Sequence, residues 1–138
     1  MRKIRTSKKG FTLAELLIVV AIIGVLVGIS IPIFTTQLKK SRLATNQANA
    51  RAAYAAATAA YLDDELVIGG TYNSETGVFT ATKKAKASDT TTFSSTGTAA
   101  PSTTIKSWTV DNMGSAVYSK WEISFNGDAV NGIYYVES

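Results

Sequence analysis

The chain contains an apolar run at residues 11–34, close to its N-terminus. As one helix, these 24 residues extend over roughly 36 Å at about 1.5 Å per residue, whereas the hydrocarbon core of a bilayer is about 30 Å thick. Gly24, Gly28, Ser30 and Pro32 interrupt the apolar pattern, and membrane helices accept all four. The run is therefore long enough to cross a membrane once, and the rest of the chain is long enough for one small globular part.

A basic leader precedes the apolar run. The first ten residues hold five of the 14 Lys and Arg residues and no acid, whereas the remaining 128 residues carry nine basic and ten acidic groups. Standard pKa values give that remainder a net charge of about −1 at neutral pH. The positive charge therefore belongs to the leader, and such a leader is typical of a targeting signal that stays on the cytoplasmic side.

Two residue types that serve many enzymes are missing, because the chain contains neither Cys nor His. It therefore has no disulfide, no thiolate nucleophile, no imidazole base and no imidazole ligand for zinc. Among the acids, Glu122 and Asp128 have no nucleophile pattern beside them. We expect a protein that is not an enzyme and that uses no cofactor.

One acid, Glu15, lies at the start of the otherwise uncharged run. A charge at the bilayer centre costs about 2.5–3.5 kcal/mol, and neither a plain membrane anchor nor an ordinary secretory signal requires one. Both of those interpretations remain open on the apolar pattern alone. If the chain were cut before Phe11, however, the new α-amino group would lie about one helical turn from Glu15, and the two charges would neutralise each other.

The stretch KKGFTLAEL at residues 8–16 resembles the class III signal of type IV prepilins, in which a basic leader ends in Gly and is followed by Phe, Thr, Leu, any residue and Glu. The resemblance covers residues 8–34. It implies that a prepilin peptidase cuts after Gly10 and methylates the new amine of Phe11. It also implies that Glu15 docks each subunit onto a neighbour in a fibre.

Three residues weaken the second half of the apolar run. Pro32 donates no hydrogen bond to the carbonyl of Gly28, and both Gly24 and Gly28 have poor helix propensity. We expect the helix to loosen between residues 24 and 32, and Gly24 and Pro32 match the helix-loosening residues of the prepilin family. Ordinary membrane-helix composition and close helix packing are the alternative interpretations.

Residues 35–62 are predicted to continue the helix, because they lack Gly and Pro and are rich in Ala. Apolar residues recur there at steps of three, four and seven, which predicts a helix face that packs on a sheet. This face comprises Leu43, Ala50, Tyr54, Ala57 and Tyr61. Lys39, Lys40 and Arg42, just before it, are expected to be solvated outside the membrane.

The C-terminal part is predicted to form loops and then strands. The acidic and glycine residues at 63–70 end the helix and start a loop, and the Ser/Thr-rich segment 80–104 is expected to be a loop with short edge strands. The expected strands, which are β-branched and aromatic, are residues 107–110, 117–125 and 133–136. Trp108 and Trp121 are expected in the core.

Two polar clusters are weak candidates for ligand binding. Lys83, Lys84 and Lys86 could contact nucleic-acid phosphates, but they have no interleaved aromatic residues, and a solvated loop is favoured. The turn at 126–131 offers one carboxylate and two amides, a poor ligand set for calcium, so no metal site is expected.

These observations predict an α+β fold, in which a long N-terminal helix packs against a small antiparallel sheet of three to four strands, similar to the pilin fold. The expected parts are a leader at 1–10, a transmembrane or fibre-core helix at 11–34, and a globular head at 35–138 that includes the second half of the helix.

The resemblance implies a homopolymeric subunit that is made as a membrane precursor and assembled into a surface type IV pilus for adhesion, surface motility or DNA uptake. Its implied partners are the prepilin peptidase and the assembly platform with its ATPases. A pseudopilin of a type II secretion or competence system and a membrane-anchored adhesive module are the alternatives. Major secretion pseudopilins usually have a Tyr-Pro step after the long helix, and Tyr61-Leu62-Asp63 stands there instead, which favours a pilus. The lack of Cys is typical of many Gram-positive pilins or of a minor subunit.

Overall fold

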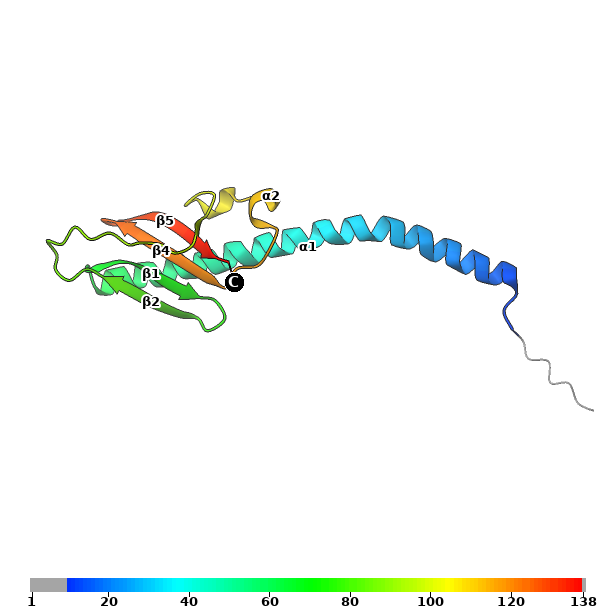
Figure 1. Ribbon diagram of the computed structural model, residues 1–138, viewed down its shortest axis with the longest axis horizontal. Coiled ribbons are helices and arrows are strands. Elements are labelled where there is room, and N and C mark those ends of the chain that lie inside the picture. The colour runs from blue at the N-terminus through cyan, green and yellow to red at the C-terminus, as the bar shows by residue number, and fades with distance from the viewer. Residues whose placement is uncertain (1–9, 138) are drawn as a thin grey trace, which may run out of the picture. The chain divides into compact units, whose positions relative to one another are not determined.

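The computed structural model describes residues 10–137 (Figure 1). The predicted leader at 1–10 therefore lies outside the described residues, except for Gly10. The chain divides into two compact units, Met1–Gln37 and Leu38–Ser138, which are described one at a time. Helix α1, Leu13–Asp63, begins in the first unit and ends in the second.

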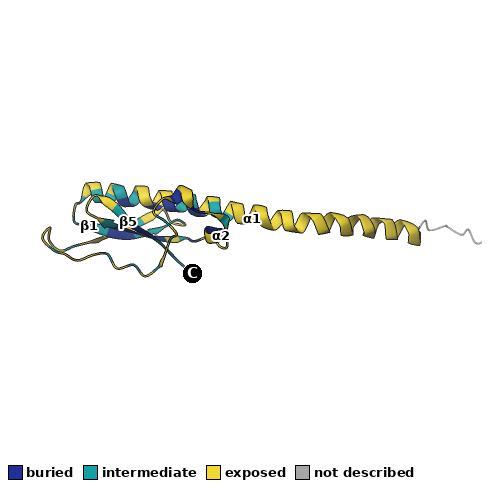
Figure 2. Cartoon of the chain, turned by 90° about the horizontal axis from the view of Figure 1, so that it is seen from above, coloured by how far each residue is buried: buried dark blue, intermediate teal, exposed yellow. Residues whose placement is uncertain are grey.

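The described part of the first unit is dominated by the apolar part of α1. Its large apolar side chains are exposed along the whole run, from Phe11 at 90% to Phe34 at 68% (Figure 2). Within residues 10–137, α1 is the one helix that is long and apolar enough to cross a membrane. A helix that is apolar on every side requires a membrane or other apolar partners to cover it.

The second unit contains a five-stranded sheet that packs against the second half of α1. The strands are β1 Val67–Asn73, β2 Val78–Lys83, β3 Thr98–Ala99, β4 Lys120–Asn126 and β5 Ala129–Val136. They lie in the order β2-β1-β4-β5-β3, and every neighbouring pair is antiparallel. A short 3-10 helix, η1 Ile105–Ser107, and a one-turn helix, α2 Val110–Met113, lie between β3 and β4.

The predicted α+β class, with one long helix on an antiparallel sheet, is confirmed, but the count of three to four strands is too low. The strand expected at 107–110 is wrong, because Trp108 and Thr109 lie between η1 and α2. Asn112 favours a helix start over a strand at this point, because its side-chain oxygen accepts a hydrogen bond from the Thr109 N–H at 2.8 Å. This bond stabilises the start of α2.

Strand β1 was expected to be part of a loop because it contains two adjacent glycines. At Gly69 an added Cβ would lie 2.6 Å from the Phe93 ring, so a residue without a side chain lets the segment after β2 pack closely on the sheet. Strand β2 occupies the start of the Ser/Thr-rich segment, and β3 is the short edge strand expected there. A glycine pair thus indicates close packing here and not only a turn.

The core lies between α1 and the sheet. Three alanines of α1, Ala50, Ala53 and Ala57, are completely buried, and their small size lets the helix approach the sheet closely. Trp108 and Trp121 are buried as predicted, and their rings stack with centroids 5.6 Å apart. The core therefore combines small side chains on the helix with large aromatic ones on the sheet side.

Tyr54 was expected on the buried helix face, and this prediction is wrong. Its side chain is 41% exposed, because the buried line of α1 runs through Ala50, Ala53 and Ala57 and leaves Tyr54 on the flank. Tyr61 lies nearer the sheet, where its ring stacks on Phe125 with centroids 5.1 Å apart. The spacing of apolar residues predicts which face of a helix is apolar, but it does not predict which part of that face the sheet covers.

Polar side chains of α1 hold the segment between β3 and β4. Asn46 is fully buried, and its amide donates to the carbonyls of Met113 at 2.8 Å and Ala116 at 2.7 Å. Its side-chain oxygen accepts from the N–H of Tyr118 at 3.0 Å. This segment has backbone groups that no strand pairs, and the helix satisfies several of them.

A second buried polar residue, Glu122 of β4, holds the Ser/Thr-rich loop. Its carboxylate accepts four hydrogen bonds from residues 95–97 of that loop, two from hydroxyl groups and two from backbone N–H groups. The donors are the Ser95 hydroxyl at 2.7 Å, the Thr96 N–H at 2.8 Å, the Thr96 hydroxyl at 2.6 Å and the Gly97 N–H at 3.1 Å. Burial alone would raise the pKa of Glu122, but these hydrogen bonds outweigh it and lower the pKa below its ordinary value.

We predict that Glu122→Gln destabilises the head by about 1–3 kcal/mol, because the new amide group would face donors and leave at least one of them unpaired. The measurement is the free energy of urea unfolding of the full chain in detergent micelles, followed by tryptophan fluorescence. Glu75→Gln, at an exposed position in the turn between β1 and β2, is the matched control. Equal stability of the two variants would contradict the assigned role of Glu122.

Candidate functional site

The predicted cleavage site lies just before the first turn of α1. Residues 10–12 are not helical, and both Gly10 and Phe11 are exposed. A protease binds its substrate in an extended form, so a peptide bond outside the helix is accessible without unwinding it. The structure thus places Gly10 and Phe11 together in an exposed, non-helical segment.

Glu15 and Thr12 form a reciprocal cap at the start of α1. The N–H of Thr12 donates to Oε2 of Glu15 at 3.1 Å, and the N–H of Glu15 donates to the Thr12 hydroxyl at 3.2 Å. This is the capping box, a Ser or Thr followed three residues later by Glu or Gln, which satisfies two backbone N–H groups that a helix start leaves free. The arrangement holds the Glu15 carboxylate at the backbone N–H of Thr12, the residue that follows Phe11.

Thr12 is the residue of this site to which the sequence analysis gave no role. The signal was present, because the Thr-x-x-Glu spacing immediately precedes an apolar run. The sequence predicts only a charged partner for the Glu15 carboxylate. Within the described residues, this carboxylate also stabilises the start of its own helix. Oε2 accepts the hydrogen bond from the Thr12 N–H, and no described residue donates to Oε1.

The helix-loosening residues lie in unbroken helix. α1 continues through Gly24, Gly28 and Pro32, so the structure of the single chain shows no unwinding there. The hydroxyl of Ser30 donates to Leu26 O at 2.6 Å, and that of Thr36 donates to Pro32 O at 3.0 Å. An added Cβ at Gly24 or Gly28 would meet no neighbouring atom within 4 Å, so packing among residues 10–137 does not require glycine at either position.

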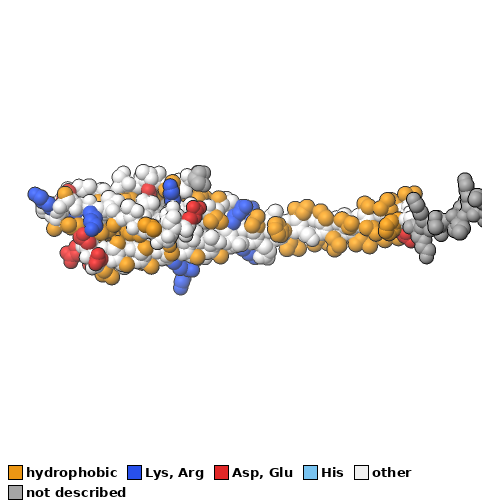
Figure 3. Space-filling model, turned by 90° about the horizontal axis from the view of Figure 1, so that it is seen from below, with side chains coloured by type: hydrophobic (Ala, Val, Ile, Leu, Met, Phe, Trp, Pro, Cys, Tyr) orange, Lys and Arg blue, Asp and Glu red, His pale blue; other side chains and the backbone are white. Residues whose placement is uncertain are grey.

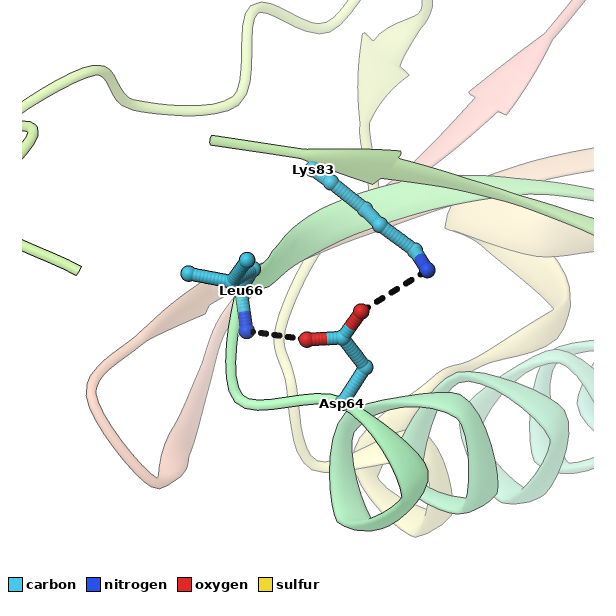
Figure 4. Close-up of polar contacts among 3 residues, drawn as sticks. All are labelled: Asp64, Leu66 and Lys83. Carbon is cyan, nitrogen blue, oxygen red and sulfur yellow. Dashed lines mark hydrogen bonds and ion pairs between the residues drawn. The ribbon is translucent and has the colours of Figure 1, made fainter. Parts of the chain in front are cut away.

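The lysine cluster considered for nucleic acid is partly used within the chain. Lys83 Nζ lies 2.8 Å from Oδ2 of Asp64, whose other oxygen accepts from the N–H of Leu66 at 2.9 Å (Figure 4). Lys83 first, and Leu66 after it, lower the pKa of Asp64, and Asp64 in turn raises the pKa of Lys83. Lys84 donates to the carbonyl of Ala87 at 3.1 Å. The cluster is better described as the anchor of a loop than as a phosphate-binding patch.

The turn considered for calcium contains one acid, Asp128, which accepts a hydrogen bond from the Tyr61 hydroxyl at 3.0 Å. Among residues 10–137 no group of three or more Asp or Glu side chains is placed to hold a metal ion. The hydrogen bond joins the end of α1 to the hairpin of β4 and β5.

The chain combines a pilin-like α+β fold with a start that resembles the type IV prepilin signal. The fold consists of a long helix with an exposed apolar start and an antiparallel sheet on its second half, and the start reads Gly-Phe-Thr-x-x-Glu. The family described as the prokaryotic N-terminal methylation motif matches residues 5–31. The chain is also 49% identical over 53 residues to the type IV narrow pilus major component PilA5 of Thermus thermophilus.

That match covers 36% of this chain and 46% of the relative, so the chain spans about half the length of the curated relative. No solved structure matches the chain. Both comparisons concern pilin-like structural proteins, since one matches the N-terminal methylation motif and the other is with a pilus component.

We predict that Thr12→Val weakens the first turn of α1 by about 1 kcal/mol, because the side chain loses the oxygen that caps Glu15 N–H. Faster amide hydrogen exchange at residues 13–16, measured by NMR in micelles, is the expected result. Thr12→Ser keeps the oxygen and is the control. Equal exchange in the two variants would show that the cap contributes nothing.

Proposed function

We propose that the chain is the precursor of a type IV pilus subunit, cut after Gly10, methylated at Phe11 and then polymerised with copies of itself. The observation that carries the proposal is the position of Glu15, a carboxylate fixed at the first turn of a helix whose apolar surface is exposed. The match of residues 5–31 to the methylation motif supports it. The Thermus relative is a major pilus component, which favours a pilus over a pseudopilin for this chain.

Cleavage would give Glu15 a partner that the uncut chain lacks. The new amine of Phe11 is mostly charged at neutral pH and needs a carboxylate when apolar segments surround it. Glu15 Oε1 can accept from the amine of a neighbouring copy while Oε2 keeps its bond to Thr12. A neighbour in any other register would leave a buried charge unpaired, at a cost of about 3–5 kcal/mol, so the pair selects one register.

The exposed apolar part of α1 has two compatible surroundings. In the precursor the bilayer covers it, and in a filament the same segments of neighbouring copies cover it. Packing within the part of the chain that the structure describes does not require Gly24 and Gly28 to be glycine. In the filament they would permit close helix contacts or local unwinding. The proposed locations are therefore the membrane for the precursor and the cell surface for the assembled pilus.

The proposed partners follow from these steps. A prepilin peptidase would process the Gly10–Phe11 bond, and a platform with its ATPases would move subunits from the bilayer into the filament. The head, predicted as residues 35–138, would be displayed outside. Adhesion, surface motility and DNA uptake are the functions that we propose for a pilus with such an exposed head.

We predict that Glu15→Ala is still cut after Gly10 but yields at least tenfold less filament, because an unpaired Phe11 amine would be buried. The measurement is the amount of subunit in filaments sheared from cells, with intact mass giving the N-terminus. Glu75→Ala, an exposed acid in the head, is the control. Normal filament yield from Glu15→Ala would exclude the docking role.

We predict a graded loss of processing from Gly10→Ala to Gly10→Val to Gly10→Phe, because a larger side chain obstructs the peptidase at the scissile bond. The uncut 138-residue chain should accumulate in membranes. Mass spectrometry of the membrane fraction distinguishes the intact chain from one that begins at methylated Phe11. Correct trimming of Gly10→Phe would contradict the assignment of this bond.

A further inference from the structure

Charges are segregated along the second half of α1. Residues 16–62 contain no acid, and the basic residues among them include three in a cluster near the start of the second unit. We name these three, Lys39, Lys40 and Arg42, the basic collar. Immediately after residue 62 the sign reverses, and the acids Asp63, Asp64 and Glu65 follow, with Asp128 nearby on the β4–β5 turn. We name these four the acidic cap. Figure 3 shows acidic side chains grouped at one end of the second unit.

A groove of about 390 Å³ lies beside the acidic cap, between α1 and the β4–β5 hairpin. Its lining includes the aromatic rings of Tyr54, Tyr61 and Phe125 and the carboxylates of Glu65 and Asp128, and it includes no cation. Aromatic faces together with carboxylates form a favourable environment for an ammonium or guanidinium group. The groove is therefore complementary to a lysine or arginine side chain.

No cation among residues 10–137 forms an ion pair with the acids that line this groove. Lys83–Asp64 is the one ion pair within residues 10–137, so Glu65 and Asp128 on one side and Lys39 and Lys40 on the other are not paired there. Apolar surface next to the groove is also uncovered, since Leu62 is 79% exposed. The carboxylates of Glu65 and Asp128 and the exposed side chain of Leu62 could therefore contact a partner molecule.

The basic collar of the same chain is too far away to be that partner. Lys40 and Leu62 are 22 residues apart on one helix, which corresponds to roughly 33 Å at about 1.5 Å per residue. Because successive helical residues point about 100° apart, the collar presents cations on several sides of α1. A second copy, parallel to the first and shifted along α1 by about the same distance, would bring its collar to the level of the groove.

We propose that the groove beside the acidic cap receives Lys39 or Lys40 from the basic collar of a second copy of this chain. The proposal rests on the pilus function proposed above and names a contact between heads in that filament. The two surfaces differ, so the contact is heterologous: the groove of one copy binds the collar of the next. Heterologous contacts build open polymers, whereas a self-complementary patch would stop at a dimer. Charge complementarity of this kind sets the register of association.

The first test uses wild-type filaments sheared from cells and a carbodiimide, which joins a lysine amine directly to a carboxylate in contact with it. Peptide mass spectrometry should find links from Lys39 or Lys40 to Glu65 or Asp128, and the distance along α1 means that such a link joins two copies. Lys83–Asp64 is the internal positive control. Filaments that give the control link but no collar-to-cap link would overturn this contact and leave the pilus function standing. Absence of the chain from filaments would overturn both.

The second test reverses charges at exposed positions. Glu65→Lys should lower the yield of sheared filament about tenfold, since it places like charges opposite each other. The processed subunit should stay at its normal level in membranes. Combining Glu65→Lys with Lys39→Glu and Lys40→Glu should restore the yield, and Glu75→Lys is the control outside both surfaces. Normal yield from Glu65→Lys alone, or no recovery in the combined variant, would refute the contact.

Discussion

The rest of the structure depends on one constraint, which is that the first part of α1 is apolar on all sides and that its side chains are exposed among the described residues. The side chains from Phe11 to Phe34 are exposed in the single chain. Leaving them in water is unfavourable by roughly 25 cal/mol for each Å² of apolar surface. A bilayer or a bundle of identical helices can cover them, and both conditions forbid stray charges in this segment. Glu15 is therefore tolerated only at the end of the run, where an amine can neutralise it.

The reciprocal cap lets Glu15 stabilise its own helix in the membrane and, in the proposed filament, also bind a neighbouring subunit. A carboxylate has two oxygens and accepts several hydrogen bonds, so Glu15 can cap its own helix and still bind the amine of a neighbour. Alanine would lose both contacts, whereas Thr12→Val removes only the hydroxyl side of the cap. The two substitutions therefore separate the stability of the helix start from assembly.

The sequence was sufficient for the features that arise from local rules and insufficient for those set by tertiary contacts. The apolar run, the continuation of α1, the buried tryptophans and two of the C-terminal strands follow from composition and period. Strand β1 was missed because glycines usually weaken strands, and the reason for Gly69 lies in Phe93, far along the chain. The roles of Asn46 and Glu122 were likewise not predictable, since their partners are backbone groups of distant loops. At the candidate site, the roles of Gly10, Phe11 and Glu15 are predictions made from spacing, whereas the hydrogen bonds of Thr12 needed geometry.

Asn46 and Glu122 also explain how a head without disulfides can hold long irregular segments. Each is buried and each binds several backbone or hydroxyl groups at once, so each fixes a stretch of chain that has few sheet hydrogen bonds. A buried polar group that is fully paired specifies one arrangement, because any other leaves it unpaired. The same principle would apply to Glu15 in the proposed filament, where a wrong register would leave a charge unpaired. Buried polar groups thus fix the position of loops within the head and, in the proposed filament, the position of one subunit against the next.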